Sequence, residues 1–250
     1  HEEAKAASEK EKRNLVAFNA RLADQKEIVR QNKTRQNALL AETKNRESNY
    51  KKLLAEQLEK RKAAEQELQE FEAQLRVEID PASLPRPGKG ILRWPLNSVK
   101  ITQYFGNTPF ASQNPQVYNN RGHNGIDLRA SVGTVVMSAA NGIVMDIGNT
   151  DTVRGCYSYG KWVLIRHFNG LATLYAHLSL TRVVPGQEVS AGEIVGYSGN
   201  TGYATGPHLH FTVYASQGVR VERFAQSKNC KNADIPIAPP EAYLNPLSYL

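Results

Sequence analysis

Two histidines stand one residue apart in the stretch TGPHLHF, at His208 and His210. On a β-strand successive side chains point to opposite faces, so these two share one face, while Leu209 and Phe211 share the other. The pattern therefore sets two imidazoles above an apolar layer. An isolated pair of this kind is more often a polar edge strand than a metal site. A metal site needs further ligands, because catalytic zinc sites take three protein side chains and leave one position for water.

A second polar stretch, RGHNGIDLR, carries His123 and Asp127 four residues apart. On a helix this spacing would bring the two side chains together, but the intervening Asn124 and Gly125 disfavour a helix. We therefore expect His123 at the end of a loop and Asp127 in the strand that follows. A carboxylate in the apolar context IDL needs a partner, which can be a metal ion, an arginine or backbone donors.

Two more histidines lie on either side of Asn169 and Gly170. The flanking runs WVLIRHF and LATLYAHL predict a β-hairpin, because a two-residue type I′ loop favours Asn-Gly. With that loop, His167 pairs with Ala172 and lies on the opposite face from His177. His177 then stands at a strand end, where functional side chains are often presented. His167, beside the turn, is expected to be structural or on the surface.

The elements that must position these side chains occupy only part of the chain. Residues 1–80 contain neither glycine nor proline, and all 18 Gly and 12 Pro lie from Pro81 onward. This contrast predicts a long helix over 1–80, a linker over 81–90 and a mainly antiparallel β domain over 91–250. Short apolar runs, frequent glycines and the lack of a second helical pattern favour a barrel or sandwich with one core.

The predicted helix carries an apolar stripe in heptad steps, interrupted by the polar run RQNKTRQN. Its members are Leu15, Phe18, Leu22, Val29, Leu39, Tyr50, Leu53, Leu68, Phe71 and Leu75. A continuous helix over this segment would be about 120 Å long and cannot bury its own stripe. It calls for a coiled-coil partner from upstream sequence, a second copy or another protein. A charged helix that acts only as a spacer is the alternative.

Charge is distributed unevenly between the two parts. The first 80 residues hold 17 Lys+Arg and 16 Asp+Glu, which leaves 14 and 8 of the chain's 31 and 24 for the remainder. A basic second part favours anionic surroundings such as cell-wall polymers, but basic clusters and nucleic-acid motifs are missing, so we expect no nucleic-acid partner. No apolar run is long enough for a membrane span or a signal peptide. Because the chain starts at His1, we expect a mature or trimmed piece of a longer protein.

The two cysteines, Cys156 and Cys230, fit an oxidising compartment if they pair and any compartment if they do not. We favour a disulfide between them. In the loop-entropy account, closing a loop of about 75 residues contributes on the order of 4 kcal/mol.

Taken together, GHNGIDLRA, YAHLS and SGNTGYATGPHLHF, in this order and at these separations, resemble the signature of lysostaphin-type (LytM-like) zinc metallopeptidases. Members of this family cut peptide bonds in peptidoglycan. The resemblance covers residues 91–250 and implies a LytM-like β fold. A long coiled coil ahead of such a domain resembles the branch of murein hydrolase activators and division-associated endopeptidases.

The resemblance also implies roles for five residues. His123, Asp127 and His210 would bind one Zn²⁺, and His177 and His208 would stand beside the metal-bound water. Zinc can lower the pKa of its bound water to about 7. One of the two remaining histidines can take the water's proton, and the other can stabilise the oxyanion or protonate the leaving amine. Which histidine does which stays open.

Three side chains are candidate contacts in a substrate groove, although ordinary surface or packing roles are equally consistent with them: Asn124, Tyr175 and Tyr203. The predicted function is zinc-dependent hydrolysis of the stem peptides and cross-bridges of bacterial peptidoglycan. This reaction would take place outside the cytoplasm. The helical arm would serve regulation or recruitment. Upstream sequence could in addition attach the protein to a membrane.

Two other functional classes remain open. A non-catalytic activator of a cell-wall amidase would be expected to lose metal ligands, whereas this sequence keeps every one of them. A binding module with a structural zinc would more often be closed by four protein ligands, frequently cysteines. Neither Cys156 nor Cys230 lies in the three motifs.

Overall fold

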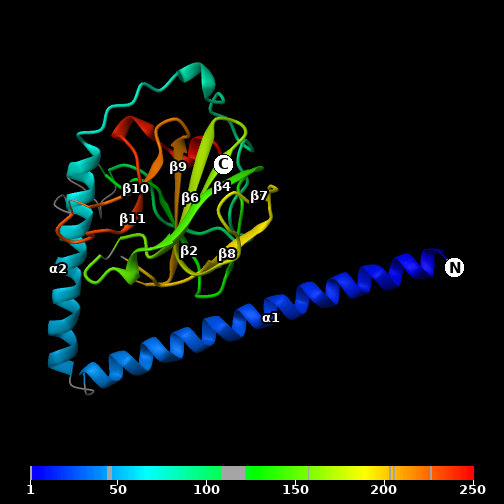
Figure 1. Ribbon diagram of the computed structural model, residues 1–250, viewed down its shortest axis with the longest axis horizontal. Helices are drawn as coiled ribbons and strands as arrows, with labels where there is room; N and C mark the ends of the chain where they lie inside the picture. The colour runs from blue at the N-terminus through cyan, green and yellow to red at the C-terminus, as the bar shows by residue number, and fades with distance from the viewer. Residues whose placement is uncertain are drawn as a thin grey trace. The chain divides into compact units, whose positions relative to one another are not determined.

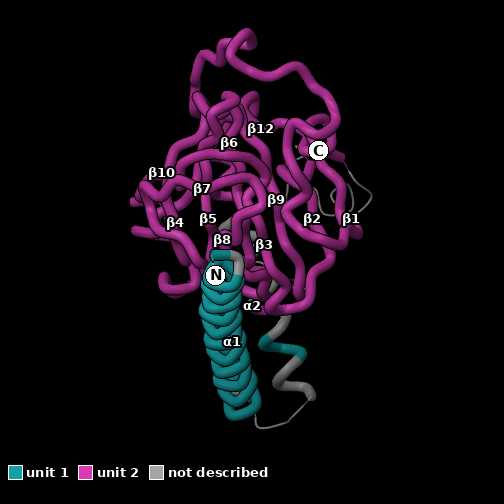
Figure 2. The backbone as a smooth tube through the Cα atoms, turned by 90° about the vertical axis from the view of Figure 1, so that its right-hand side faces the viewer, with its two compact units in different colours: residues 1–53 teal, residues 54–250 magenta. Residues whose placement is uncertain are grey.

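The computed structural model describes residues 2–43, 47–107, 122–156, 158–202, 204, 206–225 and 227–250. The chain divides into two compact units, residues 1–53 and residues 54–250 (Figure 2). The first unit is helical, and every strand that the structure describes lies in the second.

Two helices form the first part of the chain, α1 over Glu2–Thr43 and α2 over Glu47–Glu72. Their composition explains them, because alanine, glutamate, lysine, glutamine and leucine favour helix and no glycine or proline interrupts them. On α1 the predicted stripe is open to solvent, with Leu15 59% and Phe18 62% exposed. Within the described residues, neither helix is apolar over a stretch long enough to span a membrane.

Helix α2 ends at Glu72, so the predicted helix over 1–80 is too long at its C-terminal end. The physical reason lies in Leu68, Phe71 and Leu75, which pack into a core of the second unit. The Phe71 ring lies 5.0 Å from the ring of Phe224, and the last turns of α2 lie beside β10 and β11 (Figure 1). This part of the predicted arm therefore belongs with the β-rich unit.

The second unit is built on a ten-stranded antiparallel sheet with the path β1-β2-β9-β6-β5-β4-β7 (Figure 1). Off this path, β12 pairs with β9, β8 pairs with β6, and β3 pairs with β8. The predicted mainly antiparallel β architecture is confirmed. The strands of this sheet are β1 Ile101–Gln103, β2 Ile126–Arg129, β3 Val135–Met137, β4 Gly142–Asn149, β5 Lys161–His167, β6 Leu171–Thr181, β7 Glu188–Val189, β8 Ile194–Ser198, β9 His208–Ala215 and β12 Tyr243–Leu244. A separate pair consists of β10 Arg220–Arg223 and β11 Asp234–Ile237.

The central strands bury apolar side chains on both faces. On β5, Val163 and Ile165 enter one core cluster, and Trp162 and Leu164 enter the other. Such alternation is the period of two expected of a strand covered on both sides. On β9 the even-numbered residues, from His208 to Tyr214, share the face of the second cluster, which also receives Leu68.

The hairpin of β5 and β6 differs from the predicted register by one residue. Ala172 pairs with Arg166, not with His167, because the loop has three residues and ends on Gly170 in the left-handed region at φ 84°. His167 is buried; its Nδ1–H donates to the Asn141 carbonyl, and its Nε2 lies 2.8 Å from the Thr173 hydroxyl. Burial lowers its pKa to about 4, as expected of a structural histidine.

Cys156 and Cys230 form a disulfide across 74 residues of sequence, with a Cα–Cα distance of 4.3 Å. It ties the segment before β5 to the connection between β10 and β11, and both cysteines belong to the second core cluster.

Candidate active site

Neighbouring strands bring the motif residues together. β2 pairs antiparallel with β9, so that Asp127 faces His210. His123 precedes β2 and is held by a backbone bridge to Gly106. This bridge requires a glycine at position 122, where φ is 79° and a Cβ would overlap the Gly106 backbone. The structure thus has His123 at the end of a loop and Asp127 in the strand that follows, as predicted from the sequence.

His177 enters the same site from β6 in an unusual backbone conformation. Its φ of 61° places a bulky residue in the left-handed region, which costs roughly 1–3 kcal/mol and is typical of functional positions. The conformation is held by the His177 amide, which donates to the Tyr159 carbonyl at 2.9 Å. Fixed in this way, the ring turns toward His208 on β9.

Three potential ligand atoms converge at the centre of the site. His210 Nδ1 lies 2.9 Å from Asp127 Oδ1, and His123 Nε2 lies 3.2 Å from His210 Nδ1 and 3.3 Å from Asp127 Oδ1. These atoms all lie within 4.8 Å of one another, so the three residues could hold a metal ion. An imidazole lone pair and a carboxylate oxygen approach this closely only with a proton or a metal cation between them.

Hydrogen bonds on the outer side of the rings fix which nitrogen faces the centre. His123 Nδ1 lies 3.1 Å from the Tyr104 carbonyl, which leaves Nε2 for the site. His210 Nε2 lies 2.9 Å from the Thr212 hydroxyl, which leaves Nδ1. Metal-binding histidines in proteins are oriented by such outer partners, and the two imidazoles and one carboxylate therefore fit a metal ion.

The other two histidines have the same construction. His208 Nδ1 donates to the Gly206 carbonyl at 2.7 Å, and its Nε2 lies 3.6 Å from Asp127 Oδ1. His177 Nδ1 donates to the Thr201 carbonyl at 2.8 Å. The centroids of the His177 and His208 rings are 4.7 Å apart. Each ring thus directs Nε2 into the site with a fixed tautomer.

Burial sets the protonation of the cluster. Burial lowers the pKa of His177 well below its ordinary value, and the neighbouring His208 and His210 add to this effect. Burial also lowers the pKa of His210. For Asp127, burial alone would raise the pKa, but the imidazoles of His123 and His210 hold it well below its usual range. Metal binding requires a neutral imidazole and an ionised carboxylate, and the directions of the pKa shifts of His210 and Asp127 favour these forms.

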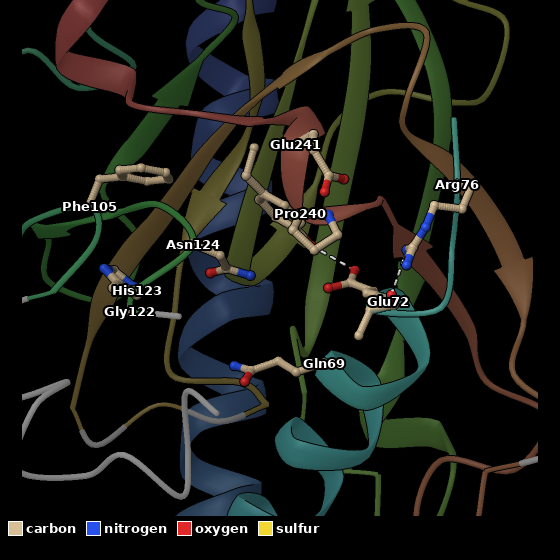
Figure 3. Close-up of a pocket in the computed structure, with 11 residues that line it drawn as sticks. Gln69, Glu72, Arg76, Phe105, Gly122, His123, Asn124, Pro240 and Glu241 are labelled. Carbon is tan, nitrogen blue, oxygen red and sulfur yellow. Dashed lines mark hydrogen bonds between the residues drawn. The ribbon is translucent and has the colours of Figure 1, made fainter. Parts of the chain in front are cut away.

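A cavity of about 460 Å³ opens beside His123. Glu72, at the end of α2, and Arg76, just beyond it, lie on the side opposite His123 and Asn124 (Figure 3). The Asn124 amide donates to the Tyr159 hydroxyl at 3.3 Å. Asn124 therefore lines this cavity, and no pattern in the sequence predicts that the end of α2 lies beside it.

A second cavity, of about 360 Å³, lies on the His208 side of the cluster. It is lined by Thr102, Gln103, Asp127, Arg129, Gly206, Pro207 and His208. The two cavities thus adjoin the histidine cluster through different residues.

Tyr175 is not a groove residue, contrary to the expectation from sequence. Its side chain is fully buried among the apolar residues of the first core cluster. The Tyr175 hydroxyl accepts from the Ala139 amide at 2.7 Å and lies 2.9 Å from the Thr173 hydroxyl. The third candidate, Tyr203, lies outside the described residues.

Comparisons with known proteins agree with these motifs. Residues 121–223 match Peptidase family M23. The DD-carboxypeptidase/endopeptidase Mpg of Neisseria meningitidis is 40% identical over 117 residues, which cover 47% of this chain and 25% of Mpg. Peptidoglycan DD-endopeptidase ShyA of Vibrio cholerae is 37% identical over 116 residues, covering 46% and 24%. The lysostaphin catalytic domain of Staphylococcus simulans aligns at 26% identity and a TM-score of 0.43, covering 60% of this chain and 91% of that domain. The chain spans about a quarter of the length of the two curated relatives.

Proposed function

We propose that this chain, whose residues 121–223 match peptidase family M23, is a zinc-dependent endopeptidase that hydrolyses peptide cross-links of bacterial peptidoglycan. The observation that carries the proposal is the convergence of His123, Asp127 and His210, beside which lie the rings of two further histidines, His177 and His208. The names of the relatives Mpg and ShyA, which describe peptidases of this kind, support the choice of substrate.

In this proposal one Zn²⁺ is held by His123 Nε2, Asp127 Oδ1 and His210 Nδ1. When bound, zinc lowers the pKa of a coordinated water and polarises a carbonyl group. The three side chains carry one negative charge between them, so the loaded site keeps a net positive charge. That charge favours the anionic groups that develop during peptide hydrolysis.

His177 and His208 are proposed to move the protons. Each ring has its Nδ1–H committed to a backbone carbonyl, so Nε2 is the nitrogen left to accept a proton or, once protonated, to donate one. One of the two takes the proton from the attacking water, and the other stabilises the oxyanion or protonates the leaving amine. Since β6 and β9 hold the two rings from neighbouring strands, their separation does not depend on a loop.

The arm is proposed to regulate the site through the last turns of α2. The Glu67 carboxylate accepts hydrogen bonds from the Ser227 hydroxyl, from the Lys228 and Asn229 amides, and from the Asn229 side chain. Burial raises the pKa of Glu67, but these hydrogen bonds outweigh burial and leave the pKa below its ordinary value. Glu72 accepts from the Ala238 amide and the Tyr243 hydroxyl. The helix end is thereby fixed beside the cavity that contains His123.

Replacing Glu67 with alanine is expected to loosen α2 and to raise the rate of wall digestion several-fold. The change removes four hydrogen bonds to a charged acceptor, each worth roughly 1.5–3 kcal/mol when fully buried and less at this partly exposed site. Hydrogen exchange of the α2 amides and release of soluble fragments from purified peptidoglycan measure the two effects. Glu70→Ala is the matched control, because Glu70 is exposed on the same helix and, among the described residues, its carboxylate accepts a hydrogen bond only from the Gln66 side chain. Faster exchange without faster digestion would remove the support for restraint.

Recruitment is the other proposed role of the arm. The exposed apolar side chains of α1, among them Leu15, Phe18 and Leu22, form the kind of stripe that a partner helix covers. We place the protein outside the cytoplasm, because peptidoglycan lies there and because a disulfide such as Cys156–Cys230 persists in oxidising compartments.

Metal analysis and wall digestion on the same sample test the proposed function. We expect one zinc per chain, release of soluble peptide fragments from purified peptidoglycan, loss of at least roughly 100-fold of this activity on chelation, and recovery with added zinc. Bound zinc without cleavage of any wall type, even in Glu67→Ala, would instead favour an activator of a cell-wall amidase. Adding the protein to such an amidase would then test that function.

A further inference from the structure

We infer that Arg129 recognises a carboxylate of the substrate close to the scissile bond. The inference rests on the proposed endopeptidase function. Arg129 is the last residue of β2 and follows Asp127 by two positions, so both side chains point to the same face of the sheet. Across the strand pair, Arg129 faces His208 as Asp127 faces His210. The guanidinium is therefore placed on the face that carries the histidine cluster.

The surroundings of Arg129 leave its charge available. The residue is exposed and lines the cavity that also contains Asp127 and His208. Its backbone amide donates to the Lys100 carbonyl, but its side chain makes no hydrogen bond or ion pair with any residue that the structure describes. The nearest carboxylate on the strand, Asp127, is engaged by His123 and His210.

The chemistry of the ligand follows from the donor. A guanidinium presents its N–H groups in a planar fork that matches a carboxylate with two parallel hydrogen bonds. In a peptide substrate the complementary groups are free carboxylates of side chains or chain ends. Positions two residues apart on a strand are separated by about 7 Å, a distance that the arginine side chain can span. The recognised carboxylate thus lies within one or two residues of the bond that is cut.

A specific selectivity follows for cross-link peptides. A peptide with a free carboxylate at this position should be preferred over the same peptide with a carboxamide, because the amide offers one acceptor and no charge. We expect a difference of roughly 10- to 100-fold in kcat/KM, the range for a charge-assisted pair. Arg129→Ala should abolish the preference by lowering only the rate on the carboxylate peptide. Arg129→Lys should retain part of the preference, because lysine keeps the positive charge but lacks the planar pair of N–H donors.

The experiment compares two synthetic cross-linked peptides that differ only in this carboxylate or carboxamide. Cleavage is measured with the wild type, Arg129→Ala, Arg129→Lys and the control Arg166→Ala. Arg166 is an exposed arginine of the same sheet, but its partner Ala172 pairs with Tyr214 at the far end of β9, about 20 Å along the strand from His208. Binding of both peptides is measured in parallel on His177→Ala, with and without Arg129→Ala.

The outcomes separate this inference from the proposed function. Equal cleavage of the two peptides by the wild type, or a preference that survives in Arg129→Ala, would overturn the role of Arg129 while leaving the endopeptidase in place. Cleavage of neither peptide, combined with tighter binding of the carboxylate form that depends on Arg129, would count against the endopeptidase and support the recognition site. If the protein binds both peptides equally well, the proposed recognition of a carboxylate by Arg129 is wrong. Zinc content is measured in every variant. If it is equal in all of them, the effect of Arg129 on cleavage does not come from loss of the metal.

Discussion

Replacing His210 with alanine is expected to remove zinc from the protein and to abolish cleavage of peptidoglycan. His210 Nδ1 lies 2.9 Å from Asp127 Oδ1, closer than the nitrogens of His123 and His208, and it also lies 3.2 Å from His123 Nε2. Its loss leaves two protein ligands where catalytic zinc sites use three. Losing an outer-shell partner of a metal ligand typically costs 10- to 100-fold in affinity, so losing the ligand itself should cost more. We expect wall digestion to fall by at least roughly 10³-fold.

Zinc stoichiometry after dialysis and release of wall fragments measure the two effects on one preparation. His167→Gln is the matched control, because His167 is also a buried histidine of the sheet but hydrogen bonds Asn141 and Thr173 away from the cluster. It should keep zinc and activity even if it lowers the stability of the fold. Full zinc content in His210→Ala at wild-type affinity would show that the metal is held elsewhere.

The candidate site was predictable where local patterning decides side-chain direction. A period of two puts His208 and His210 on one face of β9 in any sheet, and the apolar neighbours of Asp127 indicate a strand. The outer partners of His123, His177 and His208 carried no such signal. Tyr104, Thr201 and Gly206 contribute backbone carbonyls, which every residue type possesses. Their positions follow only from contacts between distant segments.

The limits of the helical arm were not predictable, because a heptad pattern does not say what covers it. Leu68 and Phe71 satisfy the repeat of a coiled coil, yet they pack against the β-rich unit. Tyr175 shows the same limit in a strand. In β6, which is buried on both faces, alternation cannot tell a core position from one that lines a groove. The loop length after His167, three residues instead of two, depended on the left-handed Gly170.

Removing either proton-carrying histidine is expected to stop catalysis while zinc stays bound. In His177→Ala and His208→Ala the three proposed ligands and the outer partners Tyr104 and Thr212 are untouched. Zinc affinity should change by no more than a few-fold. A positioned acid or base contributes 10²- to 10⁴-fold, so kcat/KM for cross-link peptides should fall by roughly that factor in each variant. The double variant should lose less than the product of the two factors, because groups that act as a unit are not additive.

The zinc content of His208→Ala separates the catalytic interpretation from a structural one. His208 Nε2 lies 3.6 Å from Asp127 Oδ1, close enough that the ring could be a fourth ligand after a small movement. If zinc is lost from this variant as fully as from His210→Ala, the site is closed by four protein ligands, which is typical of structural zinc. If zinc remains and cleavage is lost, one coordination position is open to water. His208 then acts on the reacting groups and not on the metal.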